Sequence, residues 1–183
     1  LKVRLTAKGE DEVSVFSILE DEAQRVSSIL GEEVIFSYDD EPMEAALLNI
    51  CRSQGLTLGL AESMTGGLIS SRITDIPGAS DVYKGSIVAY SNSAKNQILN
   101  VLESEVISEK AVEAMAVGAI QSLQCDVAIA VSGNAGPTAT EGEVGRVWMA
   151  TTVDGITEAF TVKWPFDRSR IRQFTTITVL NAL

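Results

Sequence analysis

Two short segments of the sequence contain side chains that together could support nucleophilic catalysis. The first, GLAESMTGGLISS at 59–71, places Ser63 between an apolar run and the glycine-rich start of a helical pattern. The second, AYSNSAK at 89–95, places Tyr90 at the expected end of a strand and Lys95 one helical turn later. A serine hydroxyl needs a base before it attacks a carbonyl carbon, and a desolvated lysine with a lowered pKa can be that base. The pattern makes Ser63 a candidate nucleophile and Lys95 its candidate base.

Each of these residues also has an ordinary interpretation, which the sequence leaves open. A serine before a helix often caps the helix N-terminus, and this is the commoner role for a serine placed as Ser63 is. A helical lysine is usually exposed, and the same expectation applies to Lys95 taken alone. Glu62 is an acceptor that stabilises the loop, a substrate contact or a solvated surface acid.

Two glycine-rich loops follow strands that read as buried on both faces. Ligands of parallel sheets bind beyond the carboxyl ends of the strands, so both loops are candidate substrate-binding loops. Glycines in them allow a substrate to approach the backbone, whose N–H groups can stabilise an oxyanion. In the loop after Ser63 the candidate donors are the N–H groups of Thr65, Gly66 and Gly67. In the second loop, SGNAG at 132–136, the candidate contacts are Gly133 and Gly136.

The segment FDRSRIR at 166–172 combines a helix start with arginines. Asp167 is a natural N-cap, yet the arginines in the first turns oppose the helix dipole at a cost of about 0.3 to 1 kcal/mol each. Arginines beside exposed N–H groups form a suitable phosphate site. Arg168 and Arg172 share a helix face and are candidate phosphate ligands, whereas Arg170 points elsewhere.

The composition excludes several kinds of site. The sequence has no histidine, which removes Ser-His-Asp catalysis, Cys-His catalysis and His-ligated zinc. Neither glycine loop has the P-loop pattern, and we expect no metal and no cofactor. A net charge of −11 argues against nucleic acid and anionic membranes as partners, and no apolar run is long enough for a membrane span. Cys51 and Cys125 stand in apolar contexts, which favours a reducing cytoplasm.

Hydrophobic periodicity predicts strands that alternate with helices. The expected strands are 56–61, 82–90, 126–133 and a hairpin at 146–164 that turns at Asp154 and Gly155. The expected helices are 41–54, 67–74, 91–99, 109–124 after an N-cap at Ser108, and one that runs from near Asp167 to the end. This order indicates an α/β fold, a three-layer α/β/α sandwich with a mixed, mostly parallel sheet.

The first 40 residues read as a separate acidic appendage. Residues 1–44 hold 12 of the 25 acidic residues but only four of the 14 basic ones. We expect a small strand-helix-strand unit there, with strands at 1–7 and 33–38 and a helix at 11–30. The predicted domains are therefore residues 1–40 and 41–183.

Residues 41–183 resemble the CinA C-terminal family. The resemblance rests on LAESMTGGLISSRITDIPGASDVYKGSIVAYSNSAKNQILNV, SEKAVEAMAVGAI, VAIAVSGNAGP, VGRVWMATT and FDRSRIR. Active members are nicotinamide-nucleotide amidohydrolases, so the resemblance implies hydrolysis of nicotinamide mononucleotide to nicotinate mononucleotide and ammonia. It assigns a Ser/Lys mechanism to Ser63 and Lys95, with Tyr90 alongside. The alternative is a catalytically silent nucleotide-binding or regulatory module of a larger CinA-type protein.

The resemblance also implies a sheet of about five strands with one antiparallel member, a pyridine nucleotide as the small-molecule partner, and a homodimer. The acidic appendage resembles the end of the linker module that precedes this domain in longer CinA proteins. Three residues depart from the family pattern: Met64 replaces a cysteine, Asn134 an apolar residue and Phe166 a glycine. We expect Met64 and Phe166 to narrow the pocket.

Overall fold

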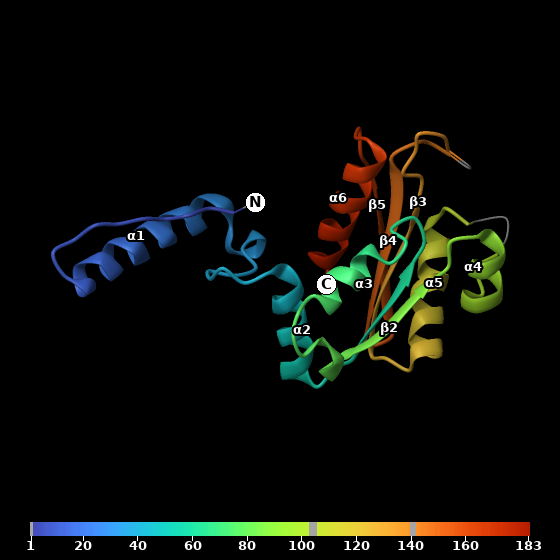
Figure 1. Ribbon diagram of the computed structural model, residues 1–183, viewed down its shortest axis with the longest axis horizontal. Coiled ribbons are helices and arrows are strands. Elements are labelled where there is room, and N and C mark those ends of the chain that lie inside the picture. The colour runs from blue at the N-terminus through green and yellow to red at the C-terminus, as the bar shows by residue number, and fades with distance from the viewer. Residues whose placement is uncertain (1, 103–105, 140–141) are drawn as a thin grey trace. The chain divides into compact units, whose positions relative to one another are not determined.

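The chain folds into two compact units, residues 1–41 and 42–183. The computed structural model describes residues 2–102, 106–139 and 142–183 (Figure 1). None of the helices in these described ranges is long and apolar enough to cross a lipid bilayer.

The first unit is built around one long helix, α1 (Glu12–Leu30), drawn in blue in Figure 1. Asp11 caps α1 by accepting a hydrogen bond from the N–H of Ser14, and Gly31 ends it at a φ of 87°. A short 3-10 turn, η1 (Glu32–Val34), follows. The helix predicted in this unit is confirmed.

The two strands predicted beside this helix, at 1–7 and 33–38, are wrong. The described part of the unit contains no strand, and its only buried residue is Ser27. Alternating apolar side chains favour a strand only where a neighbouring strand and a core receive them. Here apolar side chains such as Val3 and Phe36 remain exposed.

The second unit alternates strands and helices in the predicted order. Its strands are β1 (Leu58–Glu62), β2 (Tyr83–Val88), β3 (Val127–Gly133), β4 (Arg146–Val153) and β5 (Ile156–Lys163). Its helices are α2 (Met43–Gln54), α3 (Leu68–Thr74), the 3-10 turn η2 (Ala79–Asp81), α4 (Asn92–Leu99), α5 (Glu109–Leu123) and α6 (Arg168–Leu180). Ser91, Ser108 and Asp167 cap α4, α5 and α6 with their side chains.

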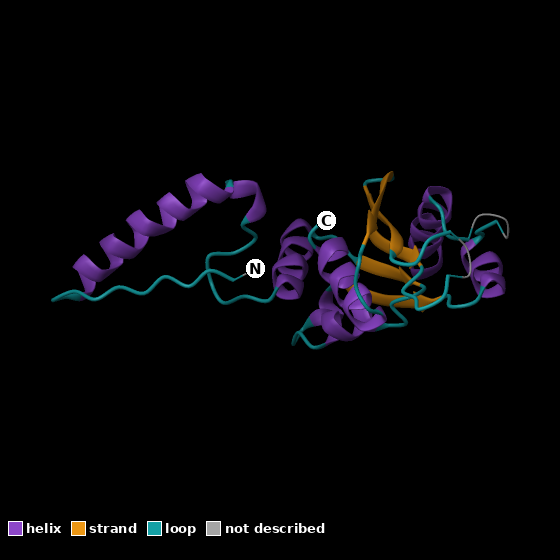
Figure 2. Cartoon of the chain, turned by 90° about the horizontal axis from the view of Figure 1, so that it is seen from above, coloured by secondary structure: helices purple, strands orange, loops and turns teal. Residues whose placement is uncertain are grey.

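The strands form one mixed sheet in the order β2-β1-β3-β4-β5, shown in orange in Figure 2. β1 pairs in parallel with β2 and β3, and β4 pairs antiparallel with β3 and β5. Four strands therefore run in one direction and β4 runs against them. This confirms the predicted mixed, mostly parallel sheet. The β4–β5 hairpin turns at Asp154 and Gly155, both at positive φ, as predicted.

Helices cover both faces of the sheet (Figure 1). α5 packs on β1, β3 and β4 with α4 beside it, whereas α3 and α6 pack on the other face with α2 against them. Side chains alternate along β1 and β3, so Ala61, Ala128 and Ala130 face α5 while Leu60 and Ile129 face the α3 and α6 side. The small residues let α5 approach the sheet closely.

The two cysteines are small core residues. Cys51 is 2% exposed and Cys125 is 5% exposed, and neither forms a disulfide. Burial raises the pKa of both thiols, which keeps them protonated at neutral pH.

Candidate active site

A cavity of about 360 Å³ lies where β1 and β3 end. Its walls come from the loops after β1, β2 and β3, from α4, from the segment before α5 and from the start of α6. The lining residues are Ser63, Met64, Tyr90, Asn92, Lys95, Val106, Ile107, Gly133, Asn134, Ala135, Gly136, Thr138 and Arg168. The fold thus gathers Ser63, Lys95, Tyr90, Gly133, Gly136 and Arg168, all predicted site residues, around one cavity.

Ser63 follows β1 directly and is 5% exposed. Its N–H donates to the carbonyl oxygen of Val131 at 3.0 Å, which extends the β1–β3 pairing by one residue. Its carbonyl oxygen accepts from the N–H of Gly66 at 3.0 Å, which closes a tight turn. Ser63 does not cap α3, because the N-cap position is Gly67, whose N–H group donates to the Glu62 carboxylate. Of the two interpretations left open, the helix cap is excluded.

The role of helix cap belongs to Glu62, which is fully buried. One carboxylate oxygen accepts from the N–H groups of Gly67 and Ile69, at 3.0 and 3.1 Å. The other accepts from the N–H of Ser70 at 2.9 Å and from the hydroxyl of Ser86 at 3.2 Å. Both oxygens are therefore engaged beneath α3, and Glu62 does not line the cavity. Its predicted role as a substrate contact is wrong, and it stabilises the loop instead.

The expected oxyanion donors need the same correction. The N–H of Gly66 is donated to Ser63 and that of Gly67 to Glu62, so neither is available to a substrate. Both glycines have positive φ, 60° and 91°, which explains why the turn uses glycine. Within the described part of the chain, the N–H groups of Met64 and Thr65 have no hydrogen-bond partner. They remain the candidate donors beside Ser63.

Lys95 is not an exposed helix lysine, because only 3% of it is exposed. Its amine donates to the carbonyl oxygen of Val106 at 3.0 Å and to the hydroxyl oxygen of Ser132 at 3.0 Å. Ser132 is the last but one residue of β3 and is fully buried. Ser132 is not among the predicted site residues, although it opens the SGNAG motif. Its alternation with Ala128 and Ala130 is the signal that places it on the Lys95 side of the sheet.

Tyr90 and Arg168 form the rim of the cavity together. The Arg168 guanidinium donates to the hydroxyl of Tyr90 at 2.7 Å and to the carbonyl oxygen of Gly136 at 2.8 Å. Arg168 thus joins the loop after β2 to the second glycine loop. Arg172 does not line the cavity, because its guanidinium donates to the carbonyl oxygen of Thr65 at 2.6 Å. This contact lets Arg172 support the Ser63 loop, and its role as a phosphate ligand stays a prediction.

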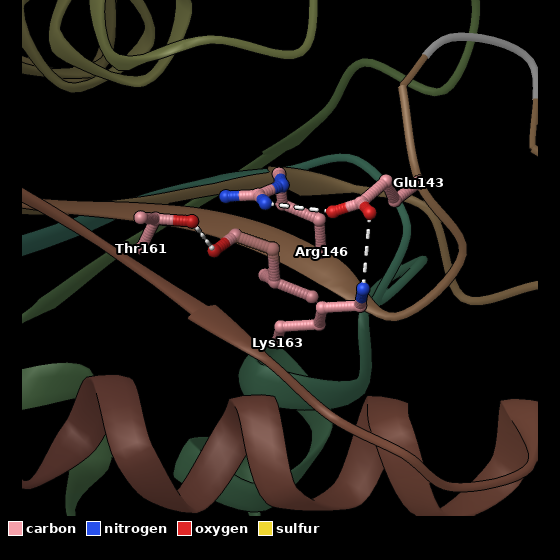
Figure 3. Close-up of polar contacts among 5 residues, drawn as sticks. Glu143, Arg146, Thr161 and Lys163 are labelled. Atoms are coloured by element: carbon pink, nitrogen blue, oxygen red, sulfur yellow. Dashed lines mark hydrogen bonds and ion pairs between the residues drawn. The ribbon is translucent and has the colours of Figure 1, made fainter.

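The second glycine loop is fixed at both ends to the β4–β5 hairpin. A side chain at Gly133 would lie 2.6 Å from the carbonyl oxygen of Arg146, so only glycine fits there. At the C-terminal end of the loop, the Glu143 carboxylate accepts hydrogen bonds from Arg146 at 2.7 Å and from Lys163 at 3.0 Å (Figure 3). Arg146 and Lys163 hold the pKa of the Glu143 carboxyl below its usual value. These contacts fix the wall that carries Asn134 and Gly136.

The three departures from the family pattern differ in where they lie. Met64 and Asn134 line the cavity, and both are almost fully buried. Phe166 does not line it, because its ring stacks on Trp164 and Phe174 with centroids 6.1 and 5.0 Å away. The expectation that Phe166 narrows the pocket is wrong.

Known proteins resemble this chain in both sequence and fold. A CinA-like protein from Geobacter metallireducens is 38% identical over 190 residues, which cover 100% of this chain and 46% of that protein. A CinA superfamily protein from Escherichia coli superposes with a TM-score of 0.75 at 27% identity, over 82% of this chain and 95% of that one. A competence/damage inducible protein from Agrobacterium tumefaciens superposes with a TM-score of 0.72 at 32% identity, over 76% and 90%.

The fold and site define an α/β/α domain with a buried lysine and a serine at the carboxyl ends of parallel strands. The sequence profile of the CinA C-terminal domain matches residues 40–183, and the chain belongs to this family. The chain spans about half the length of the curated relatives that it matches.

Proposed function

We propose that this domain hydrolyses the carboxamide of nicotinamide mononucleotide, giving nicotinate mononucleotide and ammonia. One observation carries the proposal: Ser63 and Lys95, 32 positions apart in the sequence, line the same cavity, and Lys95 is 3% exposed. A buried amine that lines the same cavity as a serine, in a chain without histidine, is the arrangement that Ser/Lys hydrolysis needs.

In the acylation step, Ser63 Oγ attacks the carboxamide carbon while the neutral Lys95 amine takes the hydroxyl proton. The negative charge that develops on the carboxamide oxygen is placed beside the N–H groups of Met64 and Thr65, which have no other partner in the described chain. The C–N bond then breaks, and the Lys95 ammonium returns the proton to the departing nitrogen, which leaves as ammonia. Ser63 then carries the nicotinate mononucleotide acyl group as an ester.

In the deacylation step, water attacks the ester carbon and loses a proton to the same lysine. The ester bond breaks, and Lys95 returns the proton to Ser63 Oγ. Lys95 therefore acts as base and acid in turn, and the enzyme ends each cycle unchanged. Apart from the substrate and one water molecule, this cycle uses only groups that the chain itself provides.

Arg168 is the proposed ligand of the 5′-phosphate. It lies on the cavity rim, and its contacts with Tyr90 and Gly136 hold the guanidinium in one position. A preorganised guanidinium suits an anion better than a mobile one, because less rotamer freedom is lost on binding. Tyr90, which is 59% exposed, is then a rim residue beside the phosphate.

Ammonia release from a panel of nicotinamide mononucleotide, its riboside and free nicotinamide tests the proposal. We expect the wild-type protein to release ammonia from the mononucleotide, and Ser63→Ala to release none. Ser71→Ala, an exposed serine on α3, is the matched control and should behave as wild type. Binding of the mononucleotide without ammonia would contradict the proposal and favour a silent nucleotide-binding module.

A further inference from the structure

Three polar atoms at the wall of the cavity form a hydrogen-bonded triangle. Lys95 Nζ donates to the Val106 carbonyl oxygen and to Ser132 Oγ, each at 3.0 Å. The Ser132 hydroxyl in turn donates to the same Val106 oxygen at 2.8 Å. Lys95 and Ser132 are both nine-tenths or more buried, at 3% and 0% exposure.

The direction of these bonds gives the two serines different roles. The Ser132 hydroxyl hydrogen is committed to Val106, so Ser132 offers Lys95 an acceptor and not a proton. Ser132 also does not line the cavity, whereas Ser63 does. Its contact with Lys95 is therefore the route by which Ser132 can affect the cavity.

A lysine used as a base needs such a support. Its four-carbon stem has several rotatable bonds, so an unsupported amine samples many positions. A displacement of about 1 Å from the reactive geometry can cost about 100-fold in rate. When Lys95 accepts a proton, the Ser132 and Val106 oxygens also accept from the charged amine, and such charge-assisted bonds are stronger than neutral ones.

We propose that Ser132 is a positioning residue that holds the Lys95 amine within reach of Ser63 and stabilises it when it is protonated. The inference rests on the proposed Ser/Lys mechanism, but not on nicotinamide mononucleotide as the substrate. The hydroxyl is the essential feature, so threonine at this position should preserve the function in part.

The test compares Ser132→Ala and Ser132→Thr in the full chain with wild type. Two rates are measured: kcat for ammonia release from nicotinamide mononucleotide, and labelling of Ser63 by a fluorophosphonate probe. The matched control is Thr152→Val, which removes a buried hydroxyl paired with Thr157 at the other end of the sheet. Urea unfolding of every variant separates a loss of fold from a loss of positioning.

In Ser132→Ala we expect kcat and the labelling rate to fall together by about 100-fold, with KM nearly unchanged. Ser132→Thr should recover most of both rates, and Thr152→Val should match wild type. Labelling that depends on Ser132 in a protein that releases no ammonia would support this inference while overturning the proposed substrate. Wild-type labelling in Ser132→Ala, or a Ser132→Thr variant as slow as Ser132→Ala, would overturn the inference.

Discussion

Lysine side chains such as that of Lys95 are almost never fully buried unless they are paired. Here it is 3% exposed, and it lies at the end of a cavity rather than inside an apolar core. Burial of such a group costs free energy of folding, which a protein recovers only in part through hydrogen bonds such as those with Val106 and Ser132. A catalytic role for the Lys95 amine, as proposed above, would account for a buried lysine that costs free energy of folding.

The first prediction concerns the proton transfer by this lysine. Lys95→Arg should lower kcat by at least about 100-fold, because a guanidinium stays charged and cannot take a proton from serine. The measurement is steady-state ammonia release, with Lys84→Arg, an exposed lysine on β2, as the control. Substantial activity in Lys95→Arg would show that Lys95 acts only as a fixed positive charge.

The second prediction concerns the phosphate. Arg168→Ala should raise KM for nicotinamide mononucleotide by roughly 10- to 100-fold, because a hydrogen bond to a charged group contributes about 1.5 to 3 kcal/mol. KM for the riboside should change much less, since the riboside has no phosphate. Arg170→Ala is the control, as Arg170 is exposed on the same helix. Equal changes for nucleotide and riboside would place the phosphate elsewhere.

The role of a single residue could be predicted from the sequence only where few residue types can fill that role. Without histidine, few bases remain for a serine, and that reasoning led to Lys95. The sequence could not choose among the three interpretations of Glu62, and it did not predict the contact of Arg172 with Thr65. Both depend on which N–H and carbonyl groups the folded loops present. Ser132 was missed because its alternation with Ala128 and Ala130 assigns it a face of the sheet but does not show that Lys95 reaches that face.

At the scale of elements, the short helix α3 depends on a side chain that precedes it. Seven residues are too few for a stable helix on their own, and its first N–H groups are bound by Glu62. The same residue fixes the strand end that presents Ser63. Helix stability and the position of Ser63, the proposed nucleophile, are therefore linked through one carboxylate.

The third prediction follows from this link. Glu62→Gln should lower the free energy of unfolding by about 1.5 to 3 kcal/mol, because one acceptor oxygen becomes a donor that faces other donors. It should also reduce kcat, although Glu62 does not line the cavity. Urea unfolding and ammonia release are the measurements. Glu109→Gln, an exposed acid in the first turn of α5, is the control. Unchanged stability in Glu62→Gln would contradict the assigned role.

Element prediction succeeded in the second unit and failed for strands in the first, for a physical reason. In the second unit, apolar periodicity, caps such as Ser91 and Ser108, and the Asp154–Gly155 turn all agree with the sheet that receives them. In the first unit, residues 2–8 alternate but have no neighbouring strand among the described residues. Alternating apolar and polar residues make a segment able to form a strand, but the strand forms only where a neighbouring strand can pair with it.

At the scale of the whole molecule, the two units differ in what holds them together. Both clusters of buried apolar side chains lie entirely within residues 42–183, as do all residues that line the cavity. The first unit is strongly acidic and buries only Ser27 among its described residues. The active-site unit therefore has a core of its own.

The fourth prediction is that a chain without residues 1–41 folds and keeps the activity. Its thermal unfolding midpoint should stay within a few degrees of that of the full chain, because no core side chain is removed. Ammonia release per molecule should be unchanged. A loss of activity would show that the acidic unit contributes to the site.

The mass in solution of both forms tests whether the proposed homodimer needs that unit.

Mass spectrometry of the Ser63 peptide determines whether Ser63 becomes acylated during turnover. Wild-type protein is mixed with saturating nicotinamide mononucleotide, quenched in acid within the first turnover, and digested. We predict that the peptide carries the nicotinate mononucleotide acyl group on Ser63, and that the amount formed equals the ammonia released in that turnover less the free product. Ammonia released with no modified peptide at any quench time, or with the acyl group on another residue, would contradict the account.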